Sequence, residues 1–253
     1  MRLPEYSLRG PEEVTMPVVY FVGAGPGDPE LITVKGSNLL RSAEVLIYAG
    51  SLVNPALVAE SPAPVKLDSW GMSLEELIPA MVIPAMEGKL VVRLHSGDPS
   101  LYGAIVEQIE KLEKEGVETI IVPGVSSMFG GAAALHAQLT LKGVSESVII
   151  TRPSGKTLEN DQIRELSAHQ TTMVVFLGTG QLEEILSKVA HPPDTPAAVV
   201  YHATWPDQKI VIGTVADIAS RARDAGIQRS ALLYIGRVVN PGYQGDRRSA
   251  LYS

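Results

Sequence analysis

The sequence predicts two α/β domains, an N-terminal one (residues 16–122) on a mostly parallel sheet and a C-terminal one (residues 123–253) on a mixed sheet. Short apolar runs alternate with helical patterns along the chain. The N-terminal runs are continuously apolar, which is typical of strands buried on both faces of a parallel sheet. The composition changes after Pro123 and Gly124, where a segment of small residues begins.

In the N-terminal half, five apolar runs are interpreted as strands, at residues 18–22, 44–48, 65–67, 90–95 and 118–122. The clearest helix is expected at residues 104–115. Its apolar residues Ile105, Ile109 and Leu112 fall on one helical face.

A second helix is expected at residues 73–88, because Ser73 and Glu76 have the spacing of a capping box. Pro79 and Pro84 lie inside this segment. Each proline removes a backbone donor, so we expect the helix to kink or break there.

In the C-terminal half, the segment at residues 127–137 suits a tightly packed helix or a linker. Strands are expected at residues 147–151, 172–177, 197–201, 209–214 and 231–236, and helices at residues 160–168, 181–189 and 215–225. The turn signal Trp-Pro-Asp at residues 205–207 joins two of these strands by a short link, which predicts an antiparallel pair.

The composition of the 253 residues is that of a globular protein, with 45% hydrophobic and 19% charged residues. The absence of cysteine excludes a thiol nucleophile and a thiolate metal site. The net charge of −7 disfavours nucleic acid and anionic membranes as partners. Without a signal sequence or an apolar run long enough to span a bilayer, the protein is expected to be soluble and cytoplasmic, with residues 1–15 as a loose extension.

Three glycine-containing loops follow predicted strands, at residues 23–29, 95–103 and 123–127. Loops at the carboxyl ends of parallel strands lie at one edge of the sheet, where α/β proteins bind ligands. The first loop reads Gly-Ala-Gly-Pro-Gly-Asp-Pro. A dinucleotide fingerprint requires a glycine leading into a helix where this loop has Asp28 and prolines, so a nicotinamide-dependent oxidoreductase is disfavoured.

The five histidines share no metal-binding spacing, so no metal site is expected. His95 and His202 follow predicted strands and are the two histidines of interest. Asp28 and Asp98 are interpreted either as a pair of acids or as caps of the following turns.

The order and spacing of residues 22–29, 31–36, 96–103 and 122–127 resemble the tetrapyrrole (corrin/porphyrin) methyltransferase family. The resemblance extends from about residue 18 to residue 238. It implies an enzyme that binds S-adenosylmethionine in a cleft between two α/β domains, works as a homodimer and uses no catalytic metal ion.

Within this family the chain is similar to the subgroup that methylates carbon 11 of precorrin-4 or cobalt-precorrin-4 in cobalamin biosynthesis. Residues 49–53 read Ala-Gly-Ser-Leu-Val, where uroporphyrinogen methylases carry Tyr-Asp-Arg-Leu-Val. Residues 151–157 and 201–207 are the other subgroup markers. Because Ala49 replaces the acid–base candidate of the uroporphyrinogen enzymes, no catalytic residue is assigned.

The resemblance assigns thirteen residues to the cofactor: Pro26, Ser96, Gly97, Asp98, Leu101, Ser126, Ser127, Phe176, Leu177, Ala203, Thr204, Arg237 and Val238. The tetrapyrrole substrate carries several carboxylates, so basic side chains are candidates to bind it. These candidates are Lys35, Arg93, Arg152 and Lys156.

Two alternative functions stay open beside the disfavoured oxidoreductase. The same fold could methylate another corrin position, uroporphyrinogen III, ribosomal RNA or a modified histidine of a translation factor. The negative net charge argues against an RNA substrate. A non-catalytic corrinoid- or nucleotide-binding module would retain the same loops and would differ only in turnover.

Overall fold

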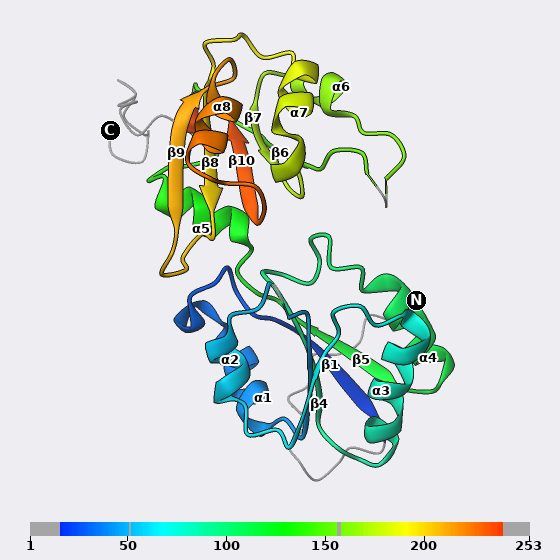
Figure 1. Cartoon of the computed structure of the whole chain (residues 1–253). Helices are drawn as coiled ribbons and strands as arrows, with labels where there is room; N and C mark the ends of the chain where they lie inside the picture. The colour runs from blue at the N-terminus through cyan, green and yellow to red at the C-terminus, as the bar shows by residue number, and fades with distance from the viewer. Residues whose placement is uncertain (1–15, 51, 156–157, 240–253) are drawn as a thin grey trace. The chain divides into compact units, whose positions relative to one another are not determined.

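The computed structural model describes residues 16–50, 52–155 and 158–239, and Figure 1 shows the course of the chain. The chain divides into two compact units. The boundary falls after Val125, close to the expected one after Val122, and Pro26–Asp28 group with the second unit. The expected loose extension at residues 1–15 lies outside the described residues.

The first unit is built on a five-stranded parallel sheet with the strand order β3-β2-β4-β1-β5. Its strands are β1 (Val18–Gly23), β2 (Val45–Tyr48), β3 (Val65–Asp68), β4 (Val91–His95) and β5 (Glu118–Val122). Every residue of β4 is buried, as expected of a central strand covered on both faces. The structure confirms the predicted parallel sheet.

Helices cover both faces of this sheet (Figure 1). They are α1 (Val34–Ser42), α2 (Pro55–Glu60), α3 (Leu74–Met86) and α4 (Val106–Lys114), with the short 3-10 turn η1 (Pro29–Leu31) after the first loop. The helices α1 and α2 pack Leu40 and Leu57 against one face, while α3 and α4 pack Met81 and Leu112 against the other. The sequence analysis places α3 and α4 but not α1 and α2.

The helix α3 runs continuously through Pro79 and Pro84, so of the expected kink or break the structure excludes the break. Its amino end carries the predicted capping box, in which the Ser73 hydroxyl accepts from Glu76 and the Glu76 carboxylate accepts from Ser73. Pro79 cannot donate to the carbonyl of Glu75, but Glu75 is exposed, so water can satisfy that carbonyl. The buried apolar face of the helix supplies the remaining stabilisation.

The second unit is built on a mixed sheet with the strand order β6-β7-β10-β8-β9. Its strands are β6 (Val148–Thr151), β7 (Thr172–Val175), β8 (Pro196–Tyr201), β9 (Lys209–Thr214) and β10 (Ala231–Ile235). The strands β6 and β7 are parallel, whereas β7–β10, β10–β8 and β8–β9 are antiparallel. Both the mixed sheet and the antiparallel β8–β9 pair are therefore confirmed.

Helices also cover both faces of the second sheet. They are α5 (Ser127–Ala134), α6 (Ile163–Ser167), α7 (Leu182–Lys188) and α8 (Ile218–Asp224), with the 3-10 turns η2 (Thr179–Gln181) and η3 (Arg237–Val239). The helices α6, α7 and α8 contribute Ile163, Ile185 and Ile218 to one apolar core. The helix α5 contacts the opposite face, where the phenol of Tyr234 on β10 donates to the carbonyl of Met128 at 2.9 Å.

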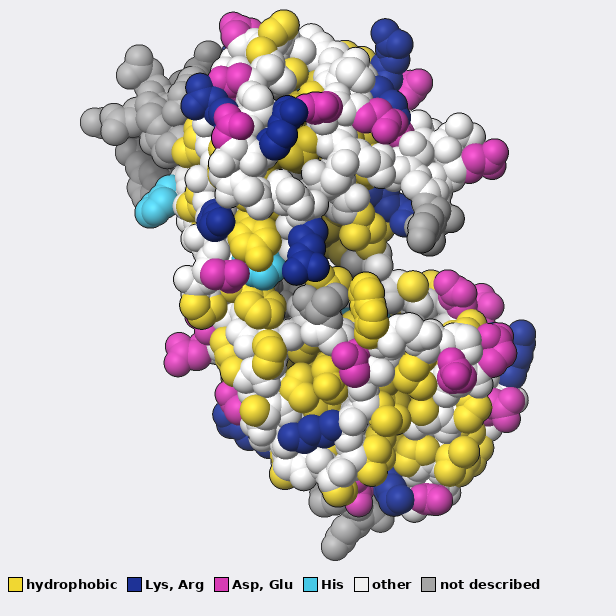
Figure 2. All heavy atoms as spheres, viewed as in Figure 1, with side chains coloured by type: hydrophobic (Ala, Val, Ile, Leu, Met, Phe, Trp, Pro, Cys, Tyr) yellow, Lys and Arg dark blue, Asp and Glu magenta, His cyan; other side chains and the backbone are white. Residues whose placement is uncertain are grey.

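Among the residues that the structure describes, no helix combines the length and the apolar character that a bilayer span requires. On the face drawn in Figure 2, acidic and basic side chains are interspersed over each unit.

Candidate active site

The three predicted glycine loops meet at one edge of the first sheet. They follow β1, β4 and β5, which are neighbours in the sheet. A Cβ atom added to Gly23 would lie 2.5 Å from the Cα atom of Gly124 and 2.7 Å from the carbonyl oxygen of Gly97. Glycine is therefore required where these loops touch, because a side chain would separate the backbones.

Backbone hydrogen bonds join the first two loops. The N–H of Gly97 donates to the carbonyl of Gly25 at 2.8 Å, and the N–H of Gly25 donates to the carbonyl of Gly97 at 3.2 Å. The N–H of Ala24 also donates to the carbonyl of His95 at 2.7 Å. Backbone hydrogen bonds thus hold the loops after β1 and β4 together at this edge of the sheet.

Asp98 joins the second loop to the third. One carboxylate oxygen accepts the N–H of Gly124 at 2.8 Å, and the other accepts the N–H of Ser100 at 2.8 Å and the Ser100 hydroxyl. Partial burial raises the pKa of Asp98, but these hydrogen bonds outweigh burial and the net shift is downward. The carboxylate is therefore ionised at neutral pH and holds the loops in place.

The other residues assigned to the cofactor in this unit lie in the same loop. Ser96 precedes Gly97 and is half-buried. Leu101 is also half-buried, and its N–H donates to the carbonyl of Asp98 at 3.2 Å. The structure therefore gathers Ser96, Gly97, Asp98 and Leu101 at the glycine edge.

In the second unit, the assigned residues Ala203 and Thr204 form the turn between β8 and β9. The backbone φ angles of His202 and Thr204 are +46° and +68°. Such left-handed conformations cost non-glycine residues about 1–3 kcal/mol each and are concentrated at functional sites. Tight hydrogen bonding maintains this turn, since the N–H of Thr204 donates to the Gln208 side chain at 2.7 Å.

The segment Pro26–Asp28 lies against this turn. The N–H of Asp28 donates to the hydroxyl of Thr204 at 2.9 Å. A Cβ atom on Gly27 would lie 2.0 Å from the indole ring of Trp205, so only glycine fits beside the ring. The structure therefore brings the assigned residue Pro26 together with Ala203 and Thr204.

The remaining assigned residues occupy other ends of the second sheet. Ser126 is the N-cap of α5, where its hydroxyl accepts the N–H of Met128 at 3.4 Å, and the assigned Ser127 is the first residue of that helix. Beyond the end of β7, Phe176 is half-buried and Leu177 is exposed with a φ of +56°. In η3, Arg237 is exposed and Val238 is buried.

The four basic candidates for substrate binding occupy different environments. Lys35 is exposed on α1, Arg152 is half-buried after β6, and Lys156 lies outside the described residues. Arg93 is only 5% exposed, and its Nη1 atom has no hydrogen-bond partner among the described residues. Burial lowers the pKa of Arg93 to about 10, an effect that the charge of Asp68 partly opposes.

His95 lies two residues beyond Arg93 on β4 and is also buried. Burial, and then the positive charge of Arg93, lower the pKa of His95 to about 3, so its imidazole is neutral at pH 7. The ring stacks on Phe21 with a centroid distance of 5.7 Å, and its Nε2 atom finds no partner among the described residues. Such a histidine is unsuited to proton transfer near neutral pH.

The sequence analysis missed a cluster at the β8–β9 turn that consists of His202, Asp207 and the rings of Tyr201 and Trp205. The imidazole Nδ1 atom of His202 lies 3.0 Å from one carboxylate oxygen of Asp207. The turn signal at residues 205–207 placed Asp207 in a tight turn. It gave no indication that the side chain folds back on His202.

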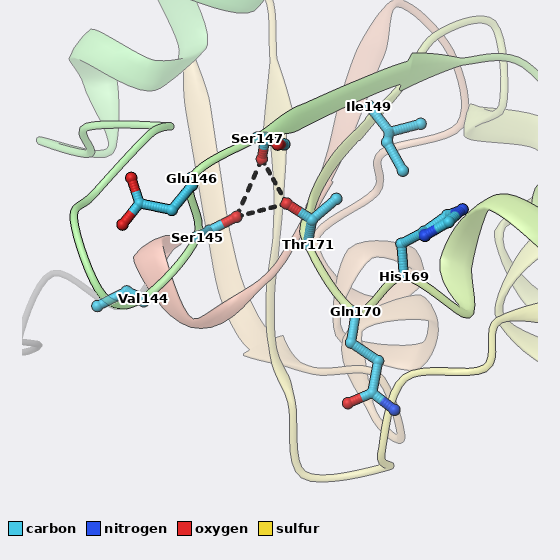
Figure 3. A pocket seen from close by; sticks show the side chains of 8 residues that line it. All are labelled: Val144, Ser145, Glu146, Ser147, Ile149, His169, Gln170 and Thr171. Carbon is cyan, nitrogen blue, oxygen red and sulfur yellow. Dashed lines mark hydrogen bonds between the residues drawn. The ribbon is translucent and has the colours of Figure 1, made fainter.

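Two other kinds of candidate site are a metal-binding cluster and a hollow outside the glycine edge. Within residues 16–50, 52–155 and 158–239, no three or more His, Cys, Asp or Glu side chains gather as a metal ion would require. A hollow of about 410 Å³ is lined by Ser145, Ser147, His169 and Thr171 among others. Figure 3 shows these side chains. The hollow lies where β6 and β7 begin and so lies apart from Phe176 and Leu177, which follow β7. Arg237 and Val238 follow β10 at the same end of the sheet as the hollow, since Ile235 pairs with Met173.

The family model described as Tetrapyrrole (Corrin/Porphyrin) Methylases matches residues 18–219. The chain is 49% identical over 231 residues to the cobalt-precorrin-4 C(11)-methyltransferase of Methanocaldococcus jannaschii, covering 89% of each chain. It is 41% identical over 238 residues to the precorrin-4 C(11)-methyltransferase of Pseudomonas aeruginosa, covering 92% of this chain and 94% of the relative.

Solved structures are similar over the same length. The X-ray structure of a cobalt precorrin-4 methyltransferase, CbiF, has 44% identity and a TM-score of 0.85, with 88% of this chain and 96% of that chain covered. A uroporphyrin-III C-methyl transferase from Thermus thermophilus, complexed with S-adenosylhomocysteine, has 30% identity and a TM-score of 0.76 over 87% of this chain and 98% of that chain.

Proposed function

This chain belongs to the tetrapyrrole (corrin/porphyrin) methylases, and on that premise we propose that it methylates carbon 11 of precorrin-4 or cobalt-precorrin-4. One observation carries the proposal: relatives named for this reaction are 41–49% identical over most of the chain. The chain also lacks the Asp and the Arg of the Tyr-Asp-Arg-Leu-Val string that uroporphyrinogen methylases carry at residues 49–53.

The methyl donor of the proposal is S-adenosylmethionine. The glycine edge supports this donor, because Gly23 and Gly124 let three loops meet at the carboxyl ends of β1, β4 and β5, where α/β proteins bind ligands. The donor carries no phosphate, so the carboxylates of Asp28 and Asp98 do not repel it. Its sulfonium is positive, and an ionised carboxylate such as that of Asp98, in the loop after β4, would attract this charge.

The structure suggests how these loops assist methyl transfer. The bound donor supplies an electrophilic methyl group, and a nucleophilic ring carbon of the substrate displaces the sulfur. Positioning the reacting atoms about 3–3.5 Å apart contributes about 7–11 kcal/mol to such reactions. Asp98 contributes by fixing the loops, because each of its oxygens already accepts a hydrogen bond from the protein.

The substrate carboxylates require positive charge. Arg93 and Arg152 are the arginines of the candidate set, and arginine binds carboxylates through two parallel hydrogen bonds. Arg93 is buried, and its Nε atom donates to the Gln108 side chain of α4 at 3.4 Å, so Arg152, which is half-buried, is the better exposed arginine of the two.

A substrate comparison tests the proposal. The protein is incubated with S-adenosylmethionine labelled with carbon-13 in the methyl group and, separately, with precorrin-4, cobalt-precorrin-4 and uroporphyrinogen III. We expect one labelled methyl group on precorrin-4 or its cobalt form, bound at carbon 11 as determined by NMR. Methylation of uroporphyrinogen III alone would replace the proposed substrate, and binding of S-adenosylhomocysteine without any turnover would indicate a non-catalytic module.

We also propose that the enzyme is a homodimer, as the family resemblance implies. Sedimentation equilibrium measures this directly. The expected mass is twice the chain mass of 27.0 kDa, and a single species with the chain mass would contradict the proposal.

A further inference from the structure

His202 is paired with a carboxylate through one of its two ring nitrogens. Its Nδ1 atom lies 3.0 and 3.1 Å from the two carboxylate oxygens of Asp207. An ionised carboxylate only accepts hydrogen bonds, so Nδ1 carries the proton and donates it. In the neutral ring, Nε2 therefore holds the lone pair that accepts a proton.

Neighbouring side chains fix the orientation of this ring. The ring of Tyr201 stacks on it with a centroid distance of 3.8 Å and an interplanar angle of 15°, and the indole of Trp205 lies 5.0 Å away at 30°. The Tyr201 hydroxyl also donates to Asp207 at 3.4 Å. A carboxylate that orients an imidazole in this way also stabilises the imidazolium ion that forms on proton uptake.

The position of His202 connects it with the site. It directly precedes Ala203 and Thr204, and its own backbone adopts the left-handed conformation at that turn. The side chain retains 22% of its exposed area, so the ring is accessible to a ligand.

The other histidines of the chain, all within the described residues, are less suited to proton transfer. His95 is sealed in the first sheet, and the Nε2 atom of His191 is bound to the carbonyl of Thr171 at 3.1 Å. His136 and His169 have no hydrogen bond or ion pair to a carboxylate recorded in the structure. His202 is thus the histidine that combines a carboxylate partner with access to ligand.

We propose that His202, oriented by Asp207, is the general base of the methyl transfer; this inference rests on the proposed function. The ring carbon forms a bond to the methyl group, and the methyl–sulfur bond breaks with its electron pair left on sulfur. The positive charge passes to the tetrapyrrole. A proton then leaves a nitrogen or carbon conjugated with the methylated carbon and binds Nε2 of His202, which later releases it to water.

Several ionisable groups of the second unit lie around this ring and influence its proton. Asp207 and Tyr201 belong to the same turn, and Asp28 lies beside it through its bond to Thr204. Arg229, from the segment before β10, acts electrostatically on Tyr201. These charges are common to the wild type and to each His202 variant, so the variants isolate the imidazole.

The test compares four variants with the wild type. His202→Asn removes the base and suits the left-handed backbone, and His202→Gly leaves space for added imidazole. Asp207→Asn tests the orienting carboxylate, and His169→Asn is the matched control because His169 is exposed in the hollow of Figure 3. Calorimetric binding of S-adenosylhomocysteine shows whether each variant retains its fold and donor site.

Single-turnover methyl transfer is then measured from about pH 6 to about pH 9, the range in which histidine bases act. We expect His202→Asn to lower the rate about 10²–10³-fold, with donor affinity unchanged within about threefold. The acidic limb of the pH–rate profile should disappear, and imidazole should restore the rate of His202→Gly. Asp207→Asn should also lower the rate, because the carboxylate that orients the ring and holds the proton on Nδ1 is lost.

The outcomes separate the two proposals. If the wild type methylates none of the three tetrapyrroles, the proposed function fails and the base assignment fails with it. If the wild type is active and His202→Asn retains its rate, only the base assignment is overturned. A slow His202→Asn variant with an unchanged acidic limb, and a His202→Gly variant that imidazole does not rescue, would also overturn it.

Discussion

A single methyl group at Gly124 tests whether the glycine edge is as tightly packed as the structure indicates. In the Gly124→Ala variant, the new Cβ atom would lie 2.1 Å from the carbonyl oxygen of Gly97 and 2.8 Å from the Cα atom of Gly23. Both neighbours are backbone, so no flexible side chain can move aside. The loops after β4 and β5 must therefore move apart.

The change in the free energy of unfolding follows from the contacts that this movement of the loops breaks. Overpacking of this kind costs about 1–3 kcal/mol. The hydrogen bond from the Gly124 N–H to the Asp98 carboxylate, 2.8 Å long, is lost if the loop moves, and bonds to charged groups contribute about 1.5–3 kcal/mol. Alanine also reduces the entropy of the unfolded chain, which offsets about 0.4–1 kcal/mol. We expect a net loss of about 2–5 kcal/mol in the free energy of unfolding.

Urea unfolding followed by far-UV circular dichroism measures this loss, and calorimetry with S-adenosylhomocysteine measures its effect on the site. Gly180→Ala is the matched control, because a Cβ atom there meets nothing within 4 Å. The control should be neutral or slightly stabilising. A Gly124→Ala protein that unfolds within about 0.5 kcal/mol of the wild type, the usual range of harmless substitutions, would refute the close contact of the three loops.

Three further measurements test other parts of the structure. S-adenosylhomocysteine at 100 times its dissociation constant adds about 2.7 kcal/mol and should raise the melting temperature by about 5–11 °C; NADH should give no shift, and the reverse result would contradict the donor assignment. Tyr234→Phe removes the hydrogen bond from the phenol to the carbonyl of Met128, so urea unfolding should show a loss of about 0.5–1.5 kcal/mol, and an unchanged midpoint would count against this bond. Asp161 is buried, which raises its pKa, but hydrogen bonds from Ser154 and Lys188 outweigh burial and lower the pKa to about 2. Because the pKa of Asp161 is lower in the folded state, the stabilisation by its carboxylate is present above about pH 4 and is lost as the pH falls towards 2. Asp161→Asn should therefore be less stable than the wild type at pH 7, and the difference in the free energy of unfolding should shrink in acid. A difference that does not change with pH would exclude this charge effect.

The sequence predicted the parts of the fold that depend on local pattern. The continuous apolar runs of β1 and β4 indicated strands buried on both faces, and the spacing of Ser73 and Glu76 predicted the capping box. The three glycine loops could be placed at one edge because parallel strands share their direction. The helix α3 continues through Pro79 instead of breaking, because an exposed carbonyl at Glu75 tolerates the missing donor.

Contacts between distant residues could not be predicted in this way. Asp98 and Gly124 are 26 positions apart, and Asp28 and Thr204 are 176 positions apart. No periodicity links such pairs, so the role of Asp98 as a loop clamp becomes evident only in the structure. The burial of Arg93 was not predicted either, since its charge made it a candidate to bind the substrate carboxylates.

The grouping of Pro26–Asp28 with the second unit has a consequence for dissection of the protein. A chain divided after Val125 would yield a C-terminal fragment that lacks these residues. In that fragment the indole of Trp205 would lose the backbone that packs on it, and the hydroxyl of Thr204 would lose its donor. The second unit is therefore not a continuous stretch of the sequence. A C-terminal fragment would need a short peptide that carries residues 26–28, supplied in trans, to complete its fold.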